Sequence, residues 1–217
     1  MSVSQVIRLT CPHCHKTAED TIYTQIDAQK DKAIARKVIN GQLFWQICPH
    51  CGQSIPLSYG CIYENHEKQF MVSLVPGIRQ ETAREAAEEL KLRILDDAQA
   101  ARWRLRLVPD ANALVEKVRL FERGRDDRLM ELCKYHVWLD VRQQYPDVVI
   151  LALYYEPAGD GEKLTVLCKD RAPLAVPLSD EMLQAVRKTY NEALLAEPAV
   201  FCVDAFWAAE ILNKKNR

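Results

Sequence analysis

The spacing of apolar residues first separates the helical stretches of the chain. A run over 81–100 carries apolar residues on one helical face and charges elsewhere, which predicts an amphipathic helix. A second periodic run starts at Asp126 or Asp127 and reaches Tyr145, where a proline follows. Shorter helices are expected over 28–38, 110–121 and 205–212 and directly after Ser179. These helices lie mostly in the second half of the chain.

Alternating or continuous apolar runs predict strands on both sides of this helical part. In the N-terminal third, extended stretches are expected at 7–9, 21–26, 42–47, 54–63 and 68–75. An alternating stretch over 103–108 ends at a proline and is typical of an edge strand. Further strands are expected at 148–156, which should be buried, and at 163–170, 174–176 and 200–203. The turn 158–161 predicts a hairpin between the first two of these.

A duplicated tetrapeptide carries the main chemical signal. Cys-Pro-His-Cys occurs at 11–14 and again at 48–51, and Gly52 follows the second copy. Each copy predicts a tight turn, a knuckle, in which Pro fixes φ and Gly takes the positive φ needed to leave the turn. Four thiolates on two such turns suit a tetrahedral soft cation, so the sequence predicts one structural Zn²⁺. The predicted ligands are Cys11, Cys14, Cys48 and Cys51.

The order of elements predicts an α+β protein in three parts. Residues 1–78 read strand, knuckle, strand, knuckle, strand, with a helical insert, which is the layout of a zinc ribbon. Residues 79–146 read as a helical segment with one edge strand, and residues 147–217 as a small α/β part. A ribbon of this size buries little core. Metal binding is therefore expected to supply much of its folding free energy, about 10–16 kcal/mol in small zinc modules.

The composition and net charge limit the expected binding partners and the expected cellular location. The 217 residues carry 29 Lys and Arg against 30 Asp and Glu, so no overall basic field draws the chain to nucleic acid or to an anionic membrane. The first residues lack a secretory signal pattern, and no apolar run approaches the length of a membrane span. Four of the eight cysteines already have a metal pattern. The sequence therefore predicts a cytoplasmic protein.

Three stretches together point to a known family. They are the two knuckles, the passage 40–52 that leads through the second knuckle, and the passage Arg106–Arg128 with its Asp-Asp-Arg helix start. Over roughly residues 8–140 the chain resembles the CpXC family of bacterial and archaeal proteins, named for paired Cys-Pro-x-Cys motifs. The resemblance implies a metal-binding N-terminal domain that continues into a helical segment, in a family of uncharacterised biochemical role. This chain departs from it at His15, where a Gly is common, and at Glu64-Asn65-His66, where a short His-Asp is usual.

Other readings of the cysteines and histidines remain open. Cys-Pro-His-Cys also serves thiol–disulfide catalysts, but those place one motif between a strand and a long helix. Reversible zinc release on oxidation, as in a redox sensor, is a second alternative. The knuckle histidines, His13, His15 and His50, are expected to face solvent rather than to replace a thiolate. Core packing is expected for Cys133 with a partly buried His136, and for Cys61, Cys168 and Cys202.

The remaining patterns do not predict a reaction. No glycine-rich phosphate loop, Gly-x-Ser-x-Gly elbow or His-Glu-x-x-His helix occurs, so no residue is assigned a catalytic role. A basic stripe at Arg102, Arg104 and Arg106, with further arginines at 119–128, makes nucleic-acid binding an alternative, although acidic residues interleave with the latter. The favoured interpretation is a scaffold that binds protein partners of unknown identity. Exposed aromatic residues such as Trp45 or Tyr59 are its candidate contacts.

Overall fold

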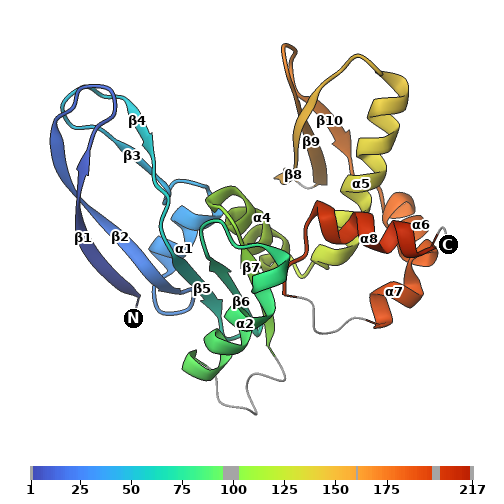
Figure 1. Ribbon diagram of the computed structural model, residues 1–217, viewed down its shortest axis with the longest axis horizontal. Helices are drawn as coiled ribbons and strands as arrows, with labels where there is room; N and C mark the ends of the chain where they lie inside the picture. Colours follow the sequence, from blue (N-terminus) through green and yellow to red (C-terminus); the bar gives the residue numbers. More distant parts are fainter. Residues whose placement is uncertain (1, 95–102, 160, 197–200, 216–217) are drawn as a thin grey trace. The chain divides into compact units, whose positions relative to one another are not determined.

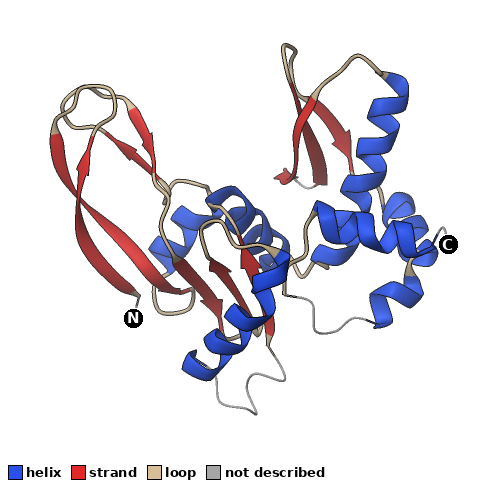
Figure 2. Ribbon diagram, viewed as in Figure 1, coloured by secondary structure: helices blue, strands red, loops and turns tan. Residues whose placement is uncertain are grey.

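The computed structural model describes residues 2–94, 103–159, 161–196 and 201–215. The chain divides into two compact units, Met1–Val118 and Arg119–Arg217 (Figure 1). Helices and strands occur in both units (Figure 2), which confirms the predicted mixture of α and β structure. Within the described ranges, none of the helices combines the length and the apolar character that crossing a membrane requires.

A five-stranded sheet organises the first unit, with strand order β1-β2-β5-β6-β7. Its strands are β1 (Val3–Thr10), β2 (Thr17–Asp27), β5 (Cys61–Asn65), β6 (Phe70–Leu74) and β7 (Arg104–Val108). Antiparallel pairing joins β5 to β6, whereas β2 pairs parallel with β5 and β7 pairs parallel with β6. All five residues of β6 are buried, so the core of this unit centres on that strand. Two helices pack beside the sheet, α1 (Lys32–Ile39) next to β2 and α2 (Gln80–Ile94) next to β7.

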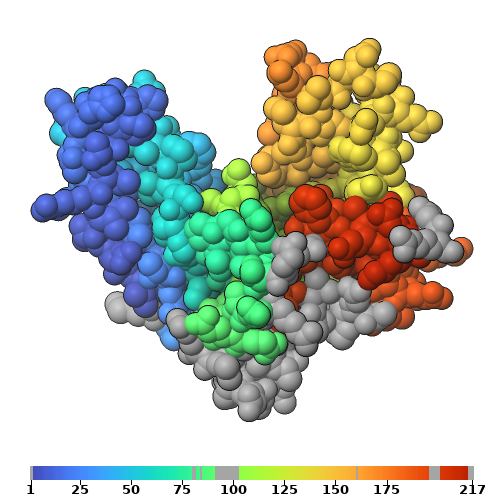
Figure 3. Space-filling view, in the orientation of Figure 1, coloured from blue at the N-terminus to red at the C-terminus, as the bar shows by residue number. Residues whose placement is uncertain are grey.

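Most of the hairpin of β1 and β2 forms a two-stranded ribbon that the other strands of the sheet do not pair with. The atoms of this hairpin are blue in Figure 3. Only the last three residues of β2, Gln25–Asp27, pair with β5, while the rest of the strand pairs with β1 alone. A second, shorter hairpin consists of β3 (Trp45–Ile47) and β4 (Ser54–Pro56). The two loops that join these strand pairs lie side by side at the far end of the ribbon (Figure 1). Each of the two loops carries one Cys-Pro-His-Cys motif.

The second unit combines a three-stranded antiparallel sheet with helices. The sheet has the order β10-β9-β8 and consists of β8 (Ile150–Ala158), β9 (Gly161–Cys168) and β10 (Leu174–Pro177). The helices are α5 (Asp127–Gln144), α6 (Asp180–Thr189), α7 (Asn191–Ala196) and α8 (Ala205–Lys215), and α4 (Ala111–Glu122) spans the boundary between the units. The apolar face of α5 packs against α6, α8 and β8. This packing confirms the amphipathic helix predicted from the sequence. The antiparallel pairing of β8 with β9 confirms the predicted C-terminal hairpin.

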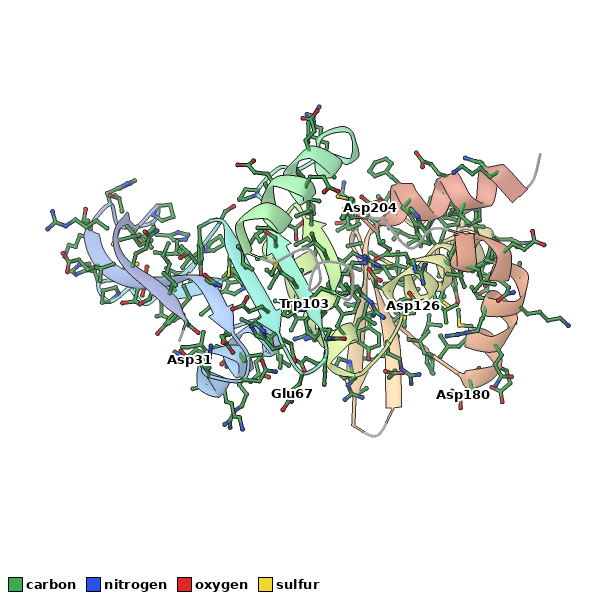
Figure 4. All side chains as sticks on the ribbon, turned by 90° about the horizontal axis from the view of Figure 1, so that it is seen from below. Asp31, Glu67, Trp103, Asp126, Asp180 and Asp204 are labelled. Atoms are coloured by element: carbon green, nitrogen blue, oxygen red, sulfur yellow. The ribbon has the colours of Figure 1, made fainter. Side chains whose placement is uncertain are left out.

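Side-chain caps fix several helix starts where the sequence places them. Asp126 accepts a hydrogen bond from the backbone N–H of Arg128 at 3.0 Å, and Asp204 accepts one from that of Trp207 at 2.9 Å (Asp126 and Asp204 are labelled in Figure 4). Ser179 accepts from Met182 at 3.2 Å. Each bond satisfies a backbone donor that the first helical turn leaves unpaired. The helix starts predicted at Asp126 or Asp127, after Ser179 and at residue 205 are confirmed.

The structure corrects the strand predicted over 54–63. This stretch forms two strands in different sheets: β4 pairs with β3, whereas β5 lies in the large sheet. Between them the chain turns away from the β3–β4 hairpin, and the N–H of Leu57 donates to the carbonyl of Phe44 at 2.9 Å. The single strand predicted here is therefore two strands that pair with different partners.

Smaller corrections concern element boundaries and burial. Leu151 in β8 is 63% exposed, so the prediction of a fully buried strand there is wrong. No strand forms at 201–203, and residue 200 lies outside the described residues. The predicted helix over 81–100 is present as α2 through Ile94, and its remaining residues, 95–100, also lie outside. Helix α7 was not predicted, and α1 begins four residues later than expected, at Lys32.

Candidate metal centre

The two knuckles have nearly the same backbone geometry. In the first, the N–H of His15 donates to the carbonyl of Cys11 at 2.9 Å; in the second, the N–H of Gly52 donates to that of Cys48 at the same distance. The residue that closes each turn has a positive φ, 57° at His15 and 72° at Gly52. Such angles cost little for glycine, but histidine bears a steric penalty. The first knuckle therefore keeps this shape although it lacks the usual glycine.

Four sulfur atoms meet where the knuckles face each other. The Sγ atoms of Cys11, Cys14, Cys48 and Cys51 all lie within 4.8 Å of one another. Two of the separations are 3.7 Å, from Cys11 to Cys51 and from Cys14 to Cys48. Zn–S bonds of about 2.3 Å in a regular tetrahedron place the sulfurs about 3.8 Å apart. The cluster therefore has the size that a tetrahedral thiolate metal site requires.

The surroundings of the sulfurs favour a thiolate at Cys48 but not at Cys51. A backbone hydrogen bond from Gln53 acts to lower the pKa of Cys51, yet burial and the neighbouring cysteine side chains raise this pKa to about 12. Cys11 and Cys48 are buried and form a small apolar cluster with Ile55, against which Cys14 packs. The backbone N–H of His13 points at the sulfur of Cys11 at 3.4 Å. In the second knuckle, hydrogen bonds from the backbone N–H groups of His50 and Cys51 lower the pKa of Cys48 to about 6. Backbone donors aimed at sulfur stabilise its charged form, which is the form that binds a metal.

The knuckle histidines lie outside this cluster. His13, His15 and His50 are all exposed, as predicted for residues that point outward from a knuckle. The ring Nε2 of His50 lies 3.3 Å from the backbone carbonyl of Thr17, the first residue of β2. The second knuckle thereby gains a contact with the ribbon that carries the first one.

The other cysteines are placed as packing residues. Cys61, Cys133 and Cys168 are buried, and burial raises the pKa of both Cys61 and Cys133 to about 12. His136 is partly buried, and its Nε2 lies 3.0 Å from the hydroxyl of Tyr190. These positions agree with the predicted core packing of the three cysteines and with the predicted partial burial of His136. Cys202 is only half-buried.

The two aromatic residues suggested as partner contacts differ in exposure. Trp45 is 52% exposed on β3. Tyr59 is half-buried with its hydroxyl oxygen enclosed, and burial raises the pKa of its phenol. Its ring centre lies 5.5 Å from that of Phe44. The prediction that Tyr59 is exposed is therefore wrong.

The predicted basic stripe on β7 is not a continuous surface. Arg104 is exposed, but Arg106 is only 5% exposed and donates to the carbonyl of Leu105 at 2.9 Å. The third member, Arg102, lies outside the described residues. In the second unit, Arg125 forms an ion pair with Glu162, and Arg128 forms one with Asp126.

Sequence analysis missed a second group of residues able to bind a metal. Asp27, Glu64 and His66 each place a ligand atom within 4.8 Å of the others. No motif marks this group, because Asp27 lies 37 residues before Glu64 and meets it only through the pairing of β2 with β5. Glu64 and His66 fall in the segment that departs from the family pattern. No role was predicted for this segment from the sequence.

Comparisons with known proteins give one match. A family model described as CpXC protein matches residues 9–134, more than half of the chain, and this range includes all four clustered cysteines. No curated protein matches this chain, and no solved structure does.

Proposed function

Since the chain belongs to the CpXC protein family, we propose that Cys11, Cys14, Cys48 and Cys51 hold one structural Zn²⁺ in a zinc ribbon. The convergence of the four sulfurs, with two separations of 3.7 Å, carries the proposal. Among common metals, Zn²⁺ combines a preference for thiolates with tetrahedral coordination. The metal would link the β1–β2 hairpin to the β3–β4 hairpin.

A structural role suits the site better than a catalytic one. Four protein ligands complete a tetrahedron and leave no open position for water or substrate. Around the knuckles the buried apolar residues are few, namely Cys11, Cys48 and Ile55, with Cys14 beside them. Metal ligation would then supply stabilisation that this small core does not provide.

The chain segments after the knuckles argue against thiol–disulfide catalysis. In such catalysts the reactive cysteine lies at the N-terminus of a helix, whose dipole stabilises the thiolate. Here each knuckle leads into a strand, the first into β2 and the second into β4. The donors near the sulfurs belong to the knuckles themselves, as expected for metal ligands.

Exposed apolar residues on the same hairpins support a role in protein binding. Trp45 is 52% exposed and Ile47 is 63% exposed, and their spacing puts both on one face of β3. An exposed aromatic beside an exposed branched residue is the kind of anchor that protein interfaces use. We propose that the zinc holds this strand in place and that the strand contacts a partner protein.

Two measurements test the proposal separately. Zinc per chain is measured by plasma mass spectrometry on protein purified without chelator, and a value near one is expected. A photo-reactive residue at Trp45 should then give a discrete cross-linked product in cell extract, and one at Val149, which is also 55% exposed, should not. A zinc content near zero contradicts the metal site, while equal cross-linking at both positions contradicts the interaction surface.

A further inference from the structure

The ends of β2 and β5 bring two buried carboxylates together. Asp27 and Glu64 are directly paired in the parallel register, so their side chains lie on the same face of the sheet. Asp27 is 3% exposed and Glu64 is 6% exposed. Two like charges side by side in a buried position destabilise the fold unless a cation lies between them.

The Asp27 carboxylate is fixed in position by its own loop. Its Oδ1 accepts hydrogen bonds from the backbone N–H groups of Gln29 at 3.1 Å and Lys30 at 3.0 Å. Its Oδ2 lies 3.0 Å from the ammonium of Lys30, whose side chain is 66% exposed. Because that ammonium reaches in from the surface, it can turn out to solvent and leave Oδ2 open to another cation.

Glu64 has weaker compensation for its charge. Its Oε1 accepts from the side-chain amide of Gln25 at 3.2 Å and lies 3.7 Å from Nε2 of His66. The Glu64 side chain is only 8% exposed, so little water reaches these contacts. A buried carboxylate is stabilised by pairing with a cation.

The histidine is held in place on two sides. The side-chain amide of Gln29 accepts from the backbone N–H of His66 at 3.0 Å and donates to Asn65 at 2.6 Å, which ties the two loops together. The ring of Trp103 meets the imidazole edge-on, with the ring centres 4.9 Å apart. Trp103 is labelled in Figure 4, as are Asp31, the residue after Lys30, and Glu67, the residue after His66. Such outer contacts orient a metal-ligating histidine.

We propose that Asp27, Glu64 and His66 form a second metal site, for a divalent first-row transition cation such as Mn²⁺, Fe²⁺ or Zn²⁺. The three ligand atoms lie within 4.8 Å of one another, close enough for one ion to contact all of them. Two carboxylates and an imidazole suit these ions, whereas thiolates select softer ones. Three protein ligands leave positions open for water or a further ligand.

This site differs in chemistry and location from the cysteine cluster. The cysteines lie at the end of the ribbon where β2 begins, and Asp27 is the last residue of β2. From Thr17 to Asp27 the strand advances by ten residue steps, a span of about 33 Å, so the two sites lie at opposite ends of β2. A metal that avoids thiolates can therefore occupy the second site without disturbing the first.

The test uses Mn²⁺ on the full chain with its cysteine site filled by zinc. Mn²⁺ prefers oxygen and nitrogen ligands, and the loss of its free electron-paramagnetic-resonance signal reports binding. One Mn²⁺ per chain is expected, and Glu64→Gln and His66→Ala should each weaken binding at least tenfold. Glu67→Gln, at the exposed residue next to His66, should leave it unchanged. Circular dichroism and zinc content verify that each variant is folded.

A further variant separates a metal site from a purely structural ion pair. Lys30→Gln removes the cation that competes for Asp27, so Mn²⁺ affinity should rise several-fold. Absence of Mn²⁺ binding by the wild-type chain at millimolar metal would overturn the proposal. So would equal weakening by Glu67→Gln and Glu64→Gln, or a Lys30→Gln variant that binds Mn²⁺ no better than wild type.

Discussion

The sulfur of Cys11 lies 3.7 Å from the sulfur of Cys51, so the first cysteine of one knuckle faces the last cysteine of the other. Cys14 faces Cys48 at the same distance. The two knuckles thus meet head to tail, with an approximate two-fold relation between turns that lie more than thirty residues apart in the chain. Each hairpin contributes half of the cluster, and neither can form it alone.

Loss of one sulfur should therefore release the metal. Cys48→Ser is expected to lower the zinc content from about one per chain to near zero, because three thiolates bind Zn²⁺ far more weakly than four. Plasma mass spectrometry gives the content, and hydrogen exchange should show faster exchange in β1 to β4. Cys202→Ser, at a half-buried cysteine outside the cluster, is the matched control and should retain its zinc. Unchanged zinc in Cys48→Ser would exclude Cys48 as a ligand.

Because Gly52 in the second knuckle has a positive φ, any side chain at this position should measurably destabilise the turn. Gly52 has φ +72°, and an added Cβ meets no atom within 4 Å, so the penalty for Gly52→Ala is conformational, about 1 kcal/mol. Because metal binding and turn formation are coupled, zinc affinity measured by chelator competition should fall about fivefold. Gly60→Ala is the comparison, since Gly60 has an ordinary φ and its added Cβ would lie 3.7 Å from the carbonyl of Leu74. An equal effect of both substitutions would argue against a conformational cause.

Local sequence signals predicted much of this fold correctly. The caps at Asp126, Ser179 and Asp204 each depend on one side chain and the next few backbone donors, so short-range sequence is enough to place them. The knuckles are equally local, and their duplication identified all four clustered cysteines. Features set by hydrogen bonds within a few residues can be read directly from the chain.

Features that depend on long-range pairing could not be predicted in this way. The split of 54–63 into β4 and β5 follows from which strands they pair with, and no local pattern encodes that choice. Arg106 alternates along β7 like a surface residue, yet it is buried beside the core. The Asp27–Glu64 pair exists only because β2 and β5 are parallel and in register. Sequence reasoning fails here for a physical reason, since the partner strand determines the environment.

A partly buried network in the second unit predicts a pH-dependent contribution to stability. Burial alone would raise the pKa of the Glu162 carboxyl, but hydrogen bonds from Arg125 and from the hydroxyl of Tyr155 hold this pKa below its ordinary value. The stabilisation is therefore present above about pH 4.5 and is lost as the pH falls through the lowered value. Arg125→Gln should reduce the free energy of unfolding by about 1–3 kcal/mol at pH 7, and by less at pH 3.

The exposed pair Arg8–Glu19 is the control for this prediction. Its side chains are 79% and 63% exposed, so solvent screens the attraction and Arg8→Gln should cost less than about 1 kcal/mol. Denaturant unfolding at several pH values measures both variants. A loss in Arg125→Gln that stays constant from pH 7 to pH 3 would mean that the charge of Glu162 is not its cause.

The histidines of the two knuckles offer a test of the ligand set itself. His50 and His13 occupy the same position in their motifs and both are exposed, but the ring of His50 lies 3.3 Å from the carbonyl of Thr17. If the four cysteines are the ligands, His50→Ala and His13→Ala should both keep one zinc per chain. They should differ in stability, because His50→Ala removes a hydrogen bond between the knuckle and the ribbon, worth about 0.5–1.5 kcal/mol. Zinc analysis and thermal unfolding of the two variants give both quantities, and loss of zinc from either one would place a histidine among the ligands.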